Sequence, residues 1–451
     1  MEPLRLSEVA TLLGAPLVGA DAQAVAVATD SRKIAPGQLF VALSGERFDG
    51  HEFIAAAKAG GAVGAIVERG GDWALPYIVV KDTRLALGQL ASALRRRLSV
   101  KLVGVTGSNG KTTVKEMTAS ILRRVGPTLY TEGNLNNDIG VPLTLFGLDS
   151  RHAFGVIEMG ASHPREIDYL ARLALPDVGV VNNAGPAHLE GFGSLDGVAR
   201  GKGEMFTALP EHGVAVINAD DAYAPLWRDL AAPRRVIDFG INNPAAVRAE
   251  QIDGSRFRLC TPAGSAAVAL PLPGRHNIMN ALAAAAAATA LDVPLELIAD
   301  GLAATPKVKG RLNWCAGGNG SRLLDDTYNA NPNSLKAALD VLANEPGERW
   351  LVLGDMGELG ADARELHARV GEWARAARVS KLFAVGRLAA EAARVFGRDG
   401  VHFPDKVALV NAVQDGLRPG VAVLIKGSRF MGMEQVVHAL TAPETSRSED
   451  N

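Results

Sequence analysis

A short apolar segment followed by a glycine-rich loop constrains this chain more than any other feature. Leu102–Val105 has the composition of a buried strand, and Gly107-Ser108-Asn109-Gly110-Lys111-Thr112-Thr113 leads from it into a helix that we expect to begin near Thr112. In such a unit glycines let backbone N–H groups turn toward an anion, and the helix N-terminus adds partial positive charge. Lys111 can neutralise the outer phosphates, and the Thr112 hydroxyl can bind Mg²⁺. The segment therefore predicts a nucleotide-binding loop.

The loop departs from the general phosphate-loop pattern at one position. That pattern has a glycine five residues before Gly110, where this chain has Val105. An ordinary glycine-rich turn followed by a surface lysine is the alternative interpretation. The strand before the loop and the helix after it favour nucleotide binding.

Apolar strand-like runs alternate with helical segments along most of the chain, which is typical of βαβ units on a parallel sheet. A length of 451 residues is enough for about two to four domains. The pattern predicts an α/β fold with three domains: a small one over residues 1–85, a central parallel-sheet, P-loop ATPase-like domain over 86–312, and a Rossmann-like domain over 313–451. The expected strands of the two larger domains are 102–105, 154–157, 178–181, 214–217, 323–324, 351–353, 382–385 and 421–425.

Charge and cysteine content exclude several classes of protein. The formal net charge of −2 gives no basic footprint for nucleic acid or for an anionic membrane. The two cysteines, Cys260 and Cys315, form no CxxC pair, so neither a disulfide framework nor a cysteine-ligated zinc site is indicated. The N-terminus lacks the apolar core of a signal peptide, and the apolar run Ala281–Leu291 is far shorter than the about 20 residues that span a bilayer. We expect a cytoplasmic protein without stable membrane insertion.

Two polar residues follow neighbouring strands of the expected central sheet. Glu158 closes the strand 154–157, and His188 lies in the loop after the strand 178–181. Because parallel strands end at one edge of a sheet, both side chains are expected near the phosphate loop, where they can hold Mg²⁺. Magnesium prefers oxygen ligands, so a histidine ligand is unusual. Taken alone, either residue is more often a solvated loop residue or a hydrogen-bonding partner.

Further candidates lie at the end of the central domain and after it. Asn277 and Asn280 are three apart on one helix face and can read a purine edge, although helix capping explains Asn277 equally well. Arg311 can reach phosphate across an interdomain cleft. The loop that contains Asp326, Tyr328 and Asn331 can meet ribose and base, or it can be a simple turn. Lys202, which we expect at the start of a helix, indicates nothing by itself.

Together these motifs resemble the Mur ligase family over essentially the whole chain. Residues 106–112 resemble its ATP loop, Glu158 and His188 occupy the positions of its magnesium ligands, and Asn277, Arg311 and Asp326 occupy nucleotide-contacting positions. Lys202 matches the lysine that is carbamylated in this family, which would turn an amine into an anionic oxygen ligand. The resemblance implies catalytic roles for Lys111, Lys202 and His188, and metal binding by Thr112, Glu158, His188 and carbamylated Lys202.

Three internal segments most resemble the family member that ligates D-alanyl-D-alanine; they are 133–144, 325–332 and 353–359. The Asp-Asn-Pro-Arg motif of the member that adds the third amino acid does not occur in the sequence. Near the N-terminus, residues 29–32 and 45–51 are similar to the UDP-sugar-binding segment of the family. The expected substrate-binding residues are Ser31, Arg32, Asp49, Gly50, His51, Asn134 and Asn137.

The resemblance implies an ATP-dependent ligase in peptidoglycan precursor synthesis. ATP with two Mg²⁺ ions would activate the tripeptide carboxylate of UDP-N-acetylmuramoyl-tripeptide as an acyl phosphate, and D-alanyl-D-alanine would then attack it. The three domains would bind the UDP substrate, bind ATP and receive the dipeptide, in a monomer that closes on ATP. Two alternatives stay open: another Mur-type or folylpolyglutamate-type amide ligase, and a nucleotide-switch or transport ATPase that does not ligate.

Overall fold

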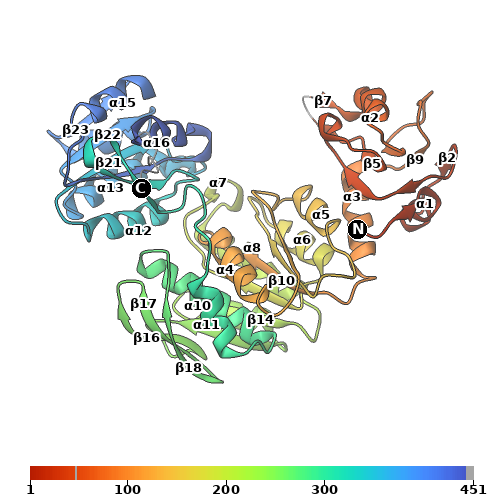
Figure 1. The fold of residues 1–451 in the computed structure, drawn as a ribbon, viewed down its shortest axis with the longest axis horizontal. Coiled ribbons are helices and arrows are strands. Elements are labelled where there is room, and N and C mark those ends of the chain that lie inside the picture. Colours follow the sequence, from red (N-terminus) through yellow and green to blue (C-terminus); the bar gives the residue numbers. More distant parts are fainter. Residues whose placement is uncertain (46–47, 443–451) are drawn as a thin grey trace, which may run out of the picture.

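The computed structural model describes residues 1–45 and 48–442. Three main β-sheets follow one another along the chain, and each is combined with helices (Figure 1). The predicted mixed α/β class is confirmed, and so are its central parallel sheet and its C-terminal parallel sheet. Glu46 and Arg47 of the expected UDP-sugar segment, and residues 443–451, lie outside the described residues.

The first sheet has the strand order β2-β9-β8-β5-β4, in which only β2 is antiparallel to its neighbour. Its strands are β2 (Leu17–Val18), β4 (Ala26–Ala28), β5 (Gln38–Val41), β8 (Gly64–Val67) and β9 (Tyr77–Val79). Two small ribbons accompany it, formed by β1 (Leu4–Arg5) with β3 (Gln23–Ala24) and by β6 (Ser44–Gly45) with β7 (Phe48–Asp49). The helical elements of this part are α1 (Leu6–Leu13), η1 (Ser31–Lys33), η2 (Gly50–Phe53), α2 (Ile54–Ala59) and α3 (Thr83–Arg95).

The central sheet has the strand order β11-β12-β10-β13-β14-β15-β16-β17-β18 and is parallel from β11 to β16. Its parallel strands are β10 (Lys101–Thr106), β11 (Thr128–Tyr130), β12 (Phe154–Glu158), β13 (Val178–Val181), β14 (Val214–Asn218), β15 (Arg235–Gly240) and β16 (Val247–Asp253). Two antiparallel strands, β17 (Arg256–Thr261) and β18 (Gly264–Ala269), extend it. This extension was missed in the sequence, although the two-residue loop Gly254-Ser255 is a hairpin signal and Gly254 has φ +59°.

Helices cover both faces of the parallel part, which explains why its strands are continuously apolar. Val103 and Val105 face the cluster that contains α4 and the alanine-rich helix α10, whereas Leu102 faces the opposite cluster. Residues 281–288 of α10, which are seven alanines and Leu282, are fully buried, as expected of the buried helix that the sequence predicts. The helices are α4 (Lys111–Leu122), α5 (Gly140–Leu145), α6 (Glu166–Ala174), α7 (Leu189–Phe192), α8 (Leu195–Ala208), α9 (Ala224–Ala231), α10 (Arg275–Ala290) and α11 (Leu295–Ala303).

The third sheet has the strand order β19-β20-β24-β21-β22-β23, with only β19 antiparallel. Its strands are β19 (Asn313–Ala316), β20 (Arg322–Asp326), β21 (Glu348–Gly354), β22 (Lys381–Val385), β23 (Gly400–Phe403) and β24 (Val421–Lys426). Separate apolar clusters lie on its two faces. The helical elements are η3 (Gly318–Gly320), α12 (Pro332–Ala343), η4 (Gly360–Asp362), α13 (Ala363–Ala376), α14 (Ala389–Phe396), α15 (Lys406–Gln414), η5 (Arg429–Met431) and α16 (Glu434–Leu440).

Two local expectations need correction, and the expected start of the helix after the phosphate loop is confirmed to within one residue. The helix after the phosphate loop begins at Lys111, one residue before the predicted start. Lys202 lies in the second half of α8 and not at the start of a helix. Asp326 ends strand β20 rather than standing in the loop after it.

The proposed border between residues 85 and 86 falls inside α3, which packs on helix α1 and on helices α5 and α6 of the central part.

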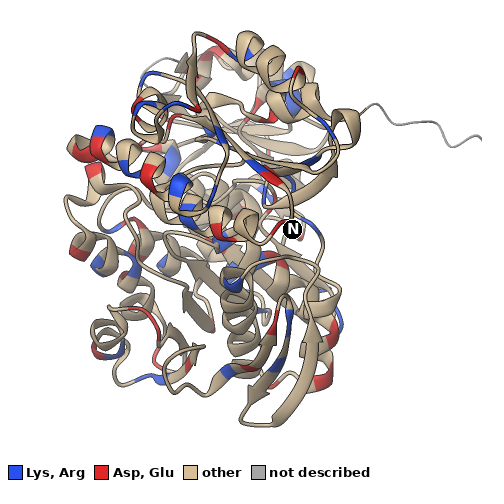
Figure 2. Cartoon of the chain, turned by 90° about the vertical axis from the view of Figure 1, so that its left-hand side faces the viewer, with Lys and Arg blue, Asp and Glu red and all other residues tan. Residues whose placement is uncertain are grey.

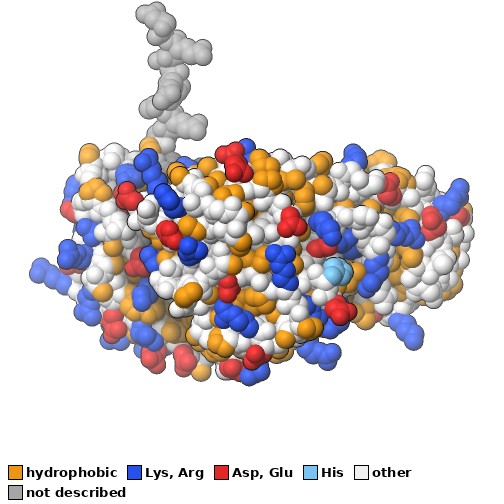
Figure 3. Space-filling view, turned by 90° about the horizontal axis from the view of Figure 1, so that it is seen from below, with side chains coloured by type: hydrophobic (Ala, Val, Ile, Leu, Met, Phe, Trp, Pro, Cys, Tyr) orange, Lys and Arg blue, Asp and Glu red, His pale blue; other side chains and the backbone are white. Residues whose placement is uncertain are grey.

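Lysine, arginine, aspartate and glutamate are interspersed over the face shown in Figure 2. On the face shown in Figure 3, hydrophobic side chains are scattered among charged ones. Within the described ranges, no helix has the length and apolar character that crossing a membrane requires. In these two views charged and apolar side chains are mixed, and neither view marks a binding surface. The candidate site is instead a cavity lined by several parts of the chain.

Candidate functional site

One large cavity of about 1160 Å³ is lined mainly by the central and C-terminal parts, and residues at the start of α3 also reach it. Its wall includes Arg84 from α3, the phosphate loop, and Tyr328 and Lys426 from the third part. Every predicted ATP-binding residue except Gly107 lines this cavity. The structure therefore brings together side chains that are more than 300 residues apart in sequence, such as Asp82 and Lys426. The site lies at the carboxyl ends of the central strands.

The phosphate loop has the backbone shape that its sequence predicts. Gly107 and Gly110 have φ values of +149° and +79°, which glycine adopts without strain. A Cβ atom on Gly110 would lie 2.3 Å from Asn280 Oδ1, so the loop also lacks room for a side chain there. Lys111 Nζ donates to the carbonyl of Gly107 at 2.8 Å, and burial lowers the pKa of this amine. The Lys111 side chain therefore folds back onto the loop, where its amine would contact a bound phosphate.

Glu158 is 2% exposed at the end of β12 and is held from two sides. Its backbone N–H donates to Thr131 Oγ1, and Asn136 Nδ2 donates to its Oε1 at 2.8 Å. Its other carboxylate oxygen, Oε2, is buried and has no hydrogen-bond partner among the described residues. A buried carboxylate oxygen without a partner is costly unless a cation occupies the adjacent space.

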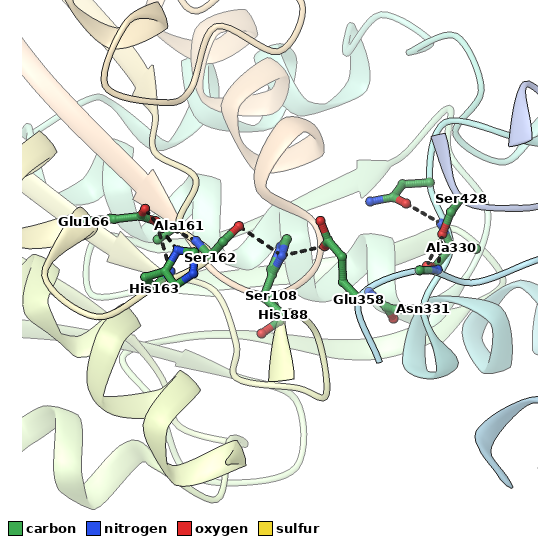
Figure 4. Close-up of polar contacts among 12 residues, drawn as sticks. Ser108, Ala161, Ser162, His163, Glu166, His188, Ala330, Asn331, Glu358 and Ser428 are labelled. Carbon is green, nitrogen blue, oxygen red and sulfur yellow. Dashed lines mark hydrogen bonds and ion pairs between the residues drawn. The ribbon is translucent and has the colours of Figure 1, made fainter. Parts of the chain in front are cut away.

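His188 lies at the N-terminus of α7 with φ +56° and lines the cavity. Its Nδ1 lies 2.6 Å from Glu358 Oε2 and 3.3 Å from Ser162 Oγ (Figure 4). Glu358 comes from the loop after β21, so this contact joins the central part to the C-terminal part. The contact with His188 lowers the pKa of the Glu358 carboxyl, which favours its anionic form.

Lys202 does not line the cavity but lies directly behind its wall. The side chain is 1% exposed, its Nζ donates to the Ala161 carbonyl at 3.1 Å, and it lies 5.2 Å from the centre of the Phe192 ring. Burial, with the nearby charge of Lys111 as a further cause, lowers the pKa of Lys202 to about 7. Near neutral pH a large fraction of this amine is therefore uncharged and nucleophilic, unlike an ordinary lysine.

Arg311, at the border between the central and C-terminal parts, and Asn331 of the C-terminal part both contact the phosphate-loop segment. Arg311 Nη2 donates to Thr112 Oγ1 at 3.0 Å, and its guanidinium stacks 4.2 Å from the centre of the Tyr328 ring. Asn331 Nδ2 donates to Asn109 Oδ1 at 2.7 Å while its own oxygen caps α12. Asp326 accepts from the backbone N–H of Leu312 and forms a buried ion pair with Lys426, which lies beside it on β24.

Asn277 and Asn280 lie inside α10, whose N-cap is Gly274, so Asn277 is not the cap. Asn280 Nδ2 donates to Asn277 Oδ1, and Asn182 Nδ2 donates to Asn280 Oδ1 at 2.8 Å. Asn182 also donates to the carbonyl of Asn109 in the phosphate loop. In this structure the Asn277 and Asn280 amides are therefore linked to the phosphate loop by hydrogen bonds through Asn182. Purine recognition by them stays a prediction.

The predicted substrate-binding residues are spread more widely. Asn137 lines the cavity and caps the start of α5 through Gly140, whereas Asn134 is exposed and outside the cavity lining. Ser31, Arg32, Asp49, Gly50 and His51 belong to the first part and do not line the cavity. Both ring nitrogens of His51 are engaged, Nδ1 with Asp49 at 2.6 Å and Nε2 as acceptor from the Glu68 N–H at 2.9 Å.

Several contributors to the site were missed in the sequence. Asn136, which holds Glu158, belongs to the same asparagine-rich segment as Asn134 and Asn137, so its residue type and position were available as a signal. Glu358 and Lys426 reach the site only through the tertiary fold. Lys426 donates to Asn329 as well as to Asp326, and local sequence contains no signal for either contact.

The donor set fits a hard divalent cation without forming a complete cage. Thr112 and Glu158 offer oxygen, His188 offers nitrogen, and all three line the cavity. Across the described ranges, no group of three or more His, Cys, Asp or Glu side chains is arranged to hold a metal. Such an incomplete site suits Mg²⁺, which usually keeps waters and shares phosphate ligands.

Comparison with known proteins agrees with this geometry. Residues 24–100 match the description "Mur ligase family, catalytic domain", 105–288 match "Mur ligase middle domain", and 310–429 match "Mur ligase, glutamate ligase domain". A UDP-N-acetylmuramoyl-tripeptide–D-alanyl-D-alanine ligase of Escherichia coli is 48% identical over 447 residues, which cover 98% of this chain and 99% of that protein. The chain belongs to the Mur ligase family.

Solved structures support the same three-part architecture for this Mur ligase. MurF from Acinetobacter baumannii superposes with a TM-score of 0.92 at 38% identity, covering 97% of this chain and 98% of that one. MurF ligase from Thermotoga maritima, solved in complex with ADP, has a TM-score of 0.81 at 28% identity and covers 92% and 96%. Family membership makes this protein an ATP-dependent amide ligase.

Proposed function

We propose that this Mur ligase joins D-alanyl-D-alanine to the terminal carboxylate of UDP-N-acetylmuramoyl-tripeptide, with release of ADP and phosphate. The single observation that carries the proposal is the convergence of the phosphate loop, Glu158 and Arg311 on one cavity. The specific acceptor and donor are those named for the 48% identical E. coli relative, which this chain matches over almost its full length. The product would enter peptidoglycan synthesis.

The first chemical step is activation of a carboxylate, which is a poor electrophile at neutral pH. A carboxylate oxygen attacks the γ-phosphorus of ATP, the bond to the ADP oxygen breaks, and an acyl phosphate results. Lys111 and the loop N–H groups, which line the cavity, would stabilise the charge that develops on the transferring phosphoryl group. Arg311, already hydrogen-bonded to Thr112, adds a positive charge from the other side.

The second step is attack of the dipeptide amine on the acyl carbon. Its lone pair forms the amide bond, the amine loses a proton, and phosphate leaves with the carboxylate oxygen it gained. Thr112, Glu158, His188 and a carbamylated Lys202 would hold two Mg²⁺ ions, which would supply charge neutralisation for the phosphates when bound. The neutral Lys202 amine can add CO₂ to give a carbamate and a proton, and its pKa of about 7 favours this.

The three domains would divide the work between them. Residues 1–85 would bind the UDP moiety through Ser31, Arg32 and Asp49–His51, residues 86–312 would bind ATP, and residues 313–451 would receive the dipeptide. Purine and ribose would contact Asn277, Asn280, Asp326, Tyr328 and Asn331. We propose that the protein acts as a monomer in the cytoplasm.

Phosphate release in the presence of UDP-N-acetylmuramoyl-tripeptide tests the proposal. We expect rapid release with D-alanyl-D-alanine, and little with D-alanine, meso-diaminopimelate or glutamate as the acceptor. Tripeptides ending in lysine or diaminopimelate, compared side by side, will define the donor. Preferred release with glutamate would favour a folylpolyglutamate-type ligase, and release independent of every acceptor would favour a switch ATPase.

A further inference from the structure

The contact between His188 and Glu358 crosses from the central part to the C-terminal part, and the proposed function gives it no role. We infer that Glu358 is a positioning residue: its carboxylate orients the His188 imidazole for metal binding only when the two parts are together. The inference rests on the proposed function, because it requires a divalent cation at His188. It assigns to the C-terminal part a contribution to the affinity of the metal site.

The geometry of the imidazole supports this role. Nδ1 lies 2.6 Å from Glu358 Oε2, so in this pair the ring nitrogen donates its proton to the carboxylate. Within residues 1–45 and 48–442 no hydrogen bond reaches Nε2, and His188 lines the cavity. An imidazole that donates through one nitrogen presents a lone pair on the other, and metal-binding histidines generally have such a carboxylate partner.

Both residues are held in unusual backbone conformations. His188 has φ +56° and Glu358 has φ +61°, which are uncommon and strained for residues other than glycine. Strain of this kind is retained where a side chain must point in one direction. In Figure 4 the two side chains point toward each other from separate segments, and Ser162 Oγ lies 3.3 Å from the same ring nitrogen, Nδ1.

The loop that carries Glu358 is fixed to the segment that touches the phosphate loop. Gly357 N–H donates to Ser428 Oγ at 2.8 Å, and Ser428 Oγ donates to the carbonyl of Ala330 at 3.2 Å. The next residue, Asn331, reaches Asn109 in the phosphate loop. Ser428 therefore ties the position of Glu358 to the contact that the C-terminal part makes with the nucleotide-binding loop (Figure 4).

A thermodynamic consequence follows from this connection. If closure brings Glu358 to His188 and so strengthens metal binding, bound metal must strengthen closure by the same factor. The carboxylate is 62% exposed as a side chain, so it supports the imidazole without being a buried structural group. Its replacement should therefore change the metal affinity and leave the fold intact.

The test uses the full chain, a nonhydrolysable ATP analogue and Mn²⁺ as the probe, with free Mn²⁺ measured by electron paramagnetic resonance. We expect the Mn²⁺ dissociation constant to rise about tenfold in Glu358→Gln, the lower end of the effect of removing a histidine-orienting carboxylate. Glu358→Asp should give an intermediate value. Glu365→Gln, an exposed glutamate of α13, is the matched control and should behave as wild type.

A second pair of variants separates orientation of His188 from a general effect on closure. In a His188→Ala background, Glu358→Gln should cause no further loss of Mn²⁺ affinity, because the group it orients is gone. Unchanged affinity in the single variant, or an equal loss in both backgrounds, would overturn the inference while leaving the ligase function standing. Failure of the wild type to bind Mn²⁺ with the analogue would overturn both.

Discussion

Replacement of Lys111 by alanine should reduce kcat by about 10³-fold or more, because the group that neutralises the transferring phosphoryl is lost. Lys111 lies on the phosphate loop, and its Nζ already contacts the Gly107 carbonyl. The UDP substrate would be bound mainly by the first part, so its dissociation constant should change by less than about twofold. Phosphate release and calorimetric titration of the UDP substrate measure the two effects separately.

A suitable control for this variant lies at the start of β10, the strand that precedes the phosphate loop. Lys101→Ala removes an exposed lysine that pairs with Asp177, a contact worth about 0–1 kcal/mol. Its kcat should stay within about twofold of wild type. If Lys111→Ala loses UDP-substrate binding together with turnover, the two sites are not separate and the division of work between the domains is wrong.

Lys202→Ala should lose about 10²-fold to 10³-fold in kcat and regain part of it when acetate or another short carboxylic acid is added. The substitution leaves a small space beside Ala161 that such an anion can enter, and its oxygens would replace those of the carbamate. Rates measured against the concentration of added acid, at fixed ionic strength, give the degree of rescue. Arg200→Ala, an exposed position on the same helix, should be neither slow nor rescued.

Carbamylation of Lys202 should increase as the pH rises. With a pKa of about 7, the neutral fraction of the Lys202 amine rises as the pH increases, from about one-tenth at pH 6 to about nine-tenths at pH 8. Wild-type activity in buffer depleted of CO₂ should therefore recover on addition of bicarbonate, and recovery should be greater at pH 8 than at pH 6. Absence of rescue in Lys202→Ala, together with no response to bicarbonate, would contradict the carbamate.

The sequence predicts those parts of the site that depend on local structure or on sheet topology. The phosphate loop was found because a strand, glycines and a helix follow one another within twelve residues. Glu158 and His188 were found because parallel strands end at one edge. The pairing of His188 with Glu358 was not found, since 170 residues separate them and only packing of the third part on the second joins them.

The environment of the Lys202 side chain could not be predicted from its residue type either. Nothing local in the sequence distinguishes Lys202 from an exposed lysine, and only the resemblance to a family suggested its role. The structure shows what the residue type alone does not, a nearly fully buried amine beside Phe192 whose pKa is lowered by burial. In the same way, the two strands after β16 alternate between buried and exposed residues, a signal of a half-exposed hairpin that was not used.

Transfer of oxygen from substrate to phosphate tests the central claim, that the loop around Lys111 delivers a phosphoryl group to a carboxylate. The measurement uses UDP-N-acetylmuramoyl-tripeptide labelled with oxygen-18 in its terminal carboxylate, together with D-alanyl-D-alanine and ATP, and mass spectrometry of the released phosphate. Passage through an acyl phosphate predicts that each released phosphate carries one carboxylate oxygen. Release of unlabelled phosphate while amide accumulates would contradict the acyl phosphate and the role we give to the loop.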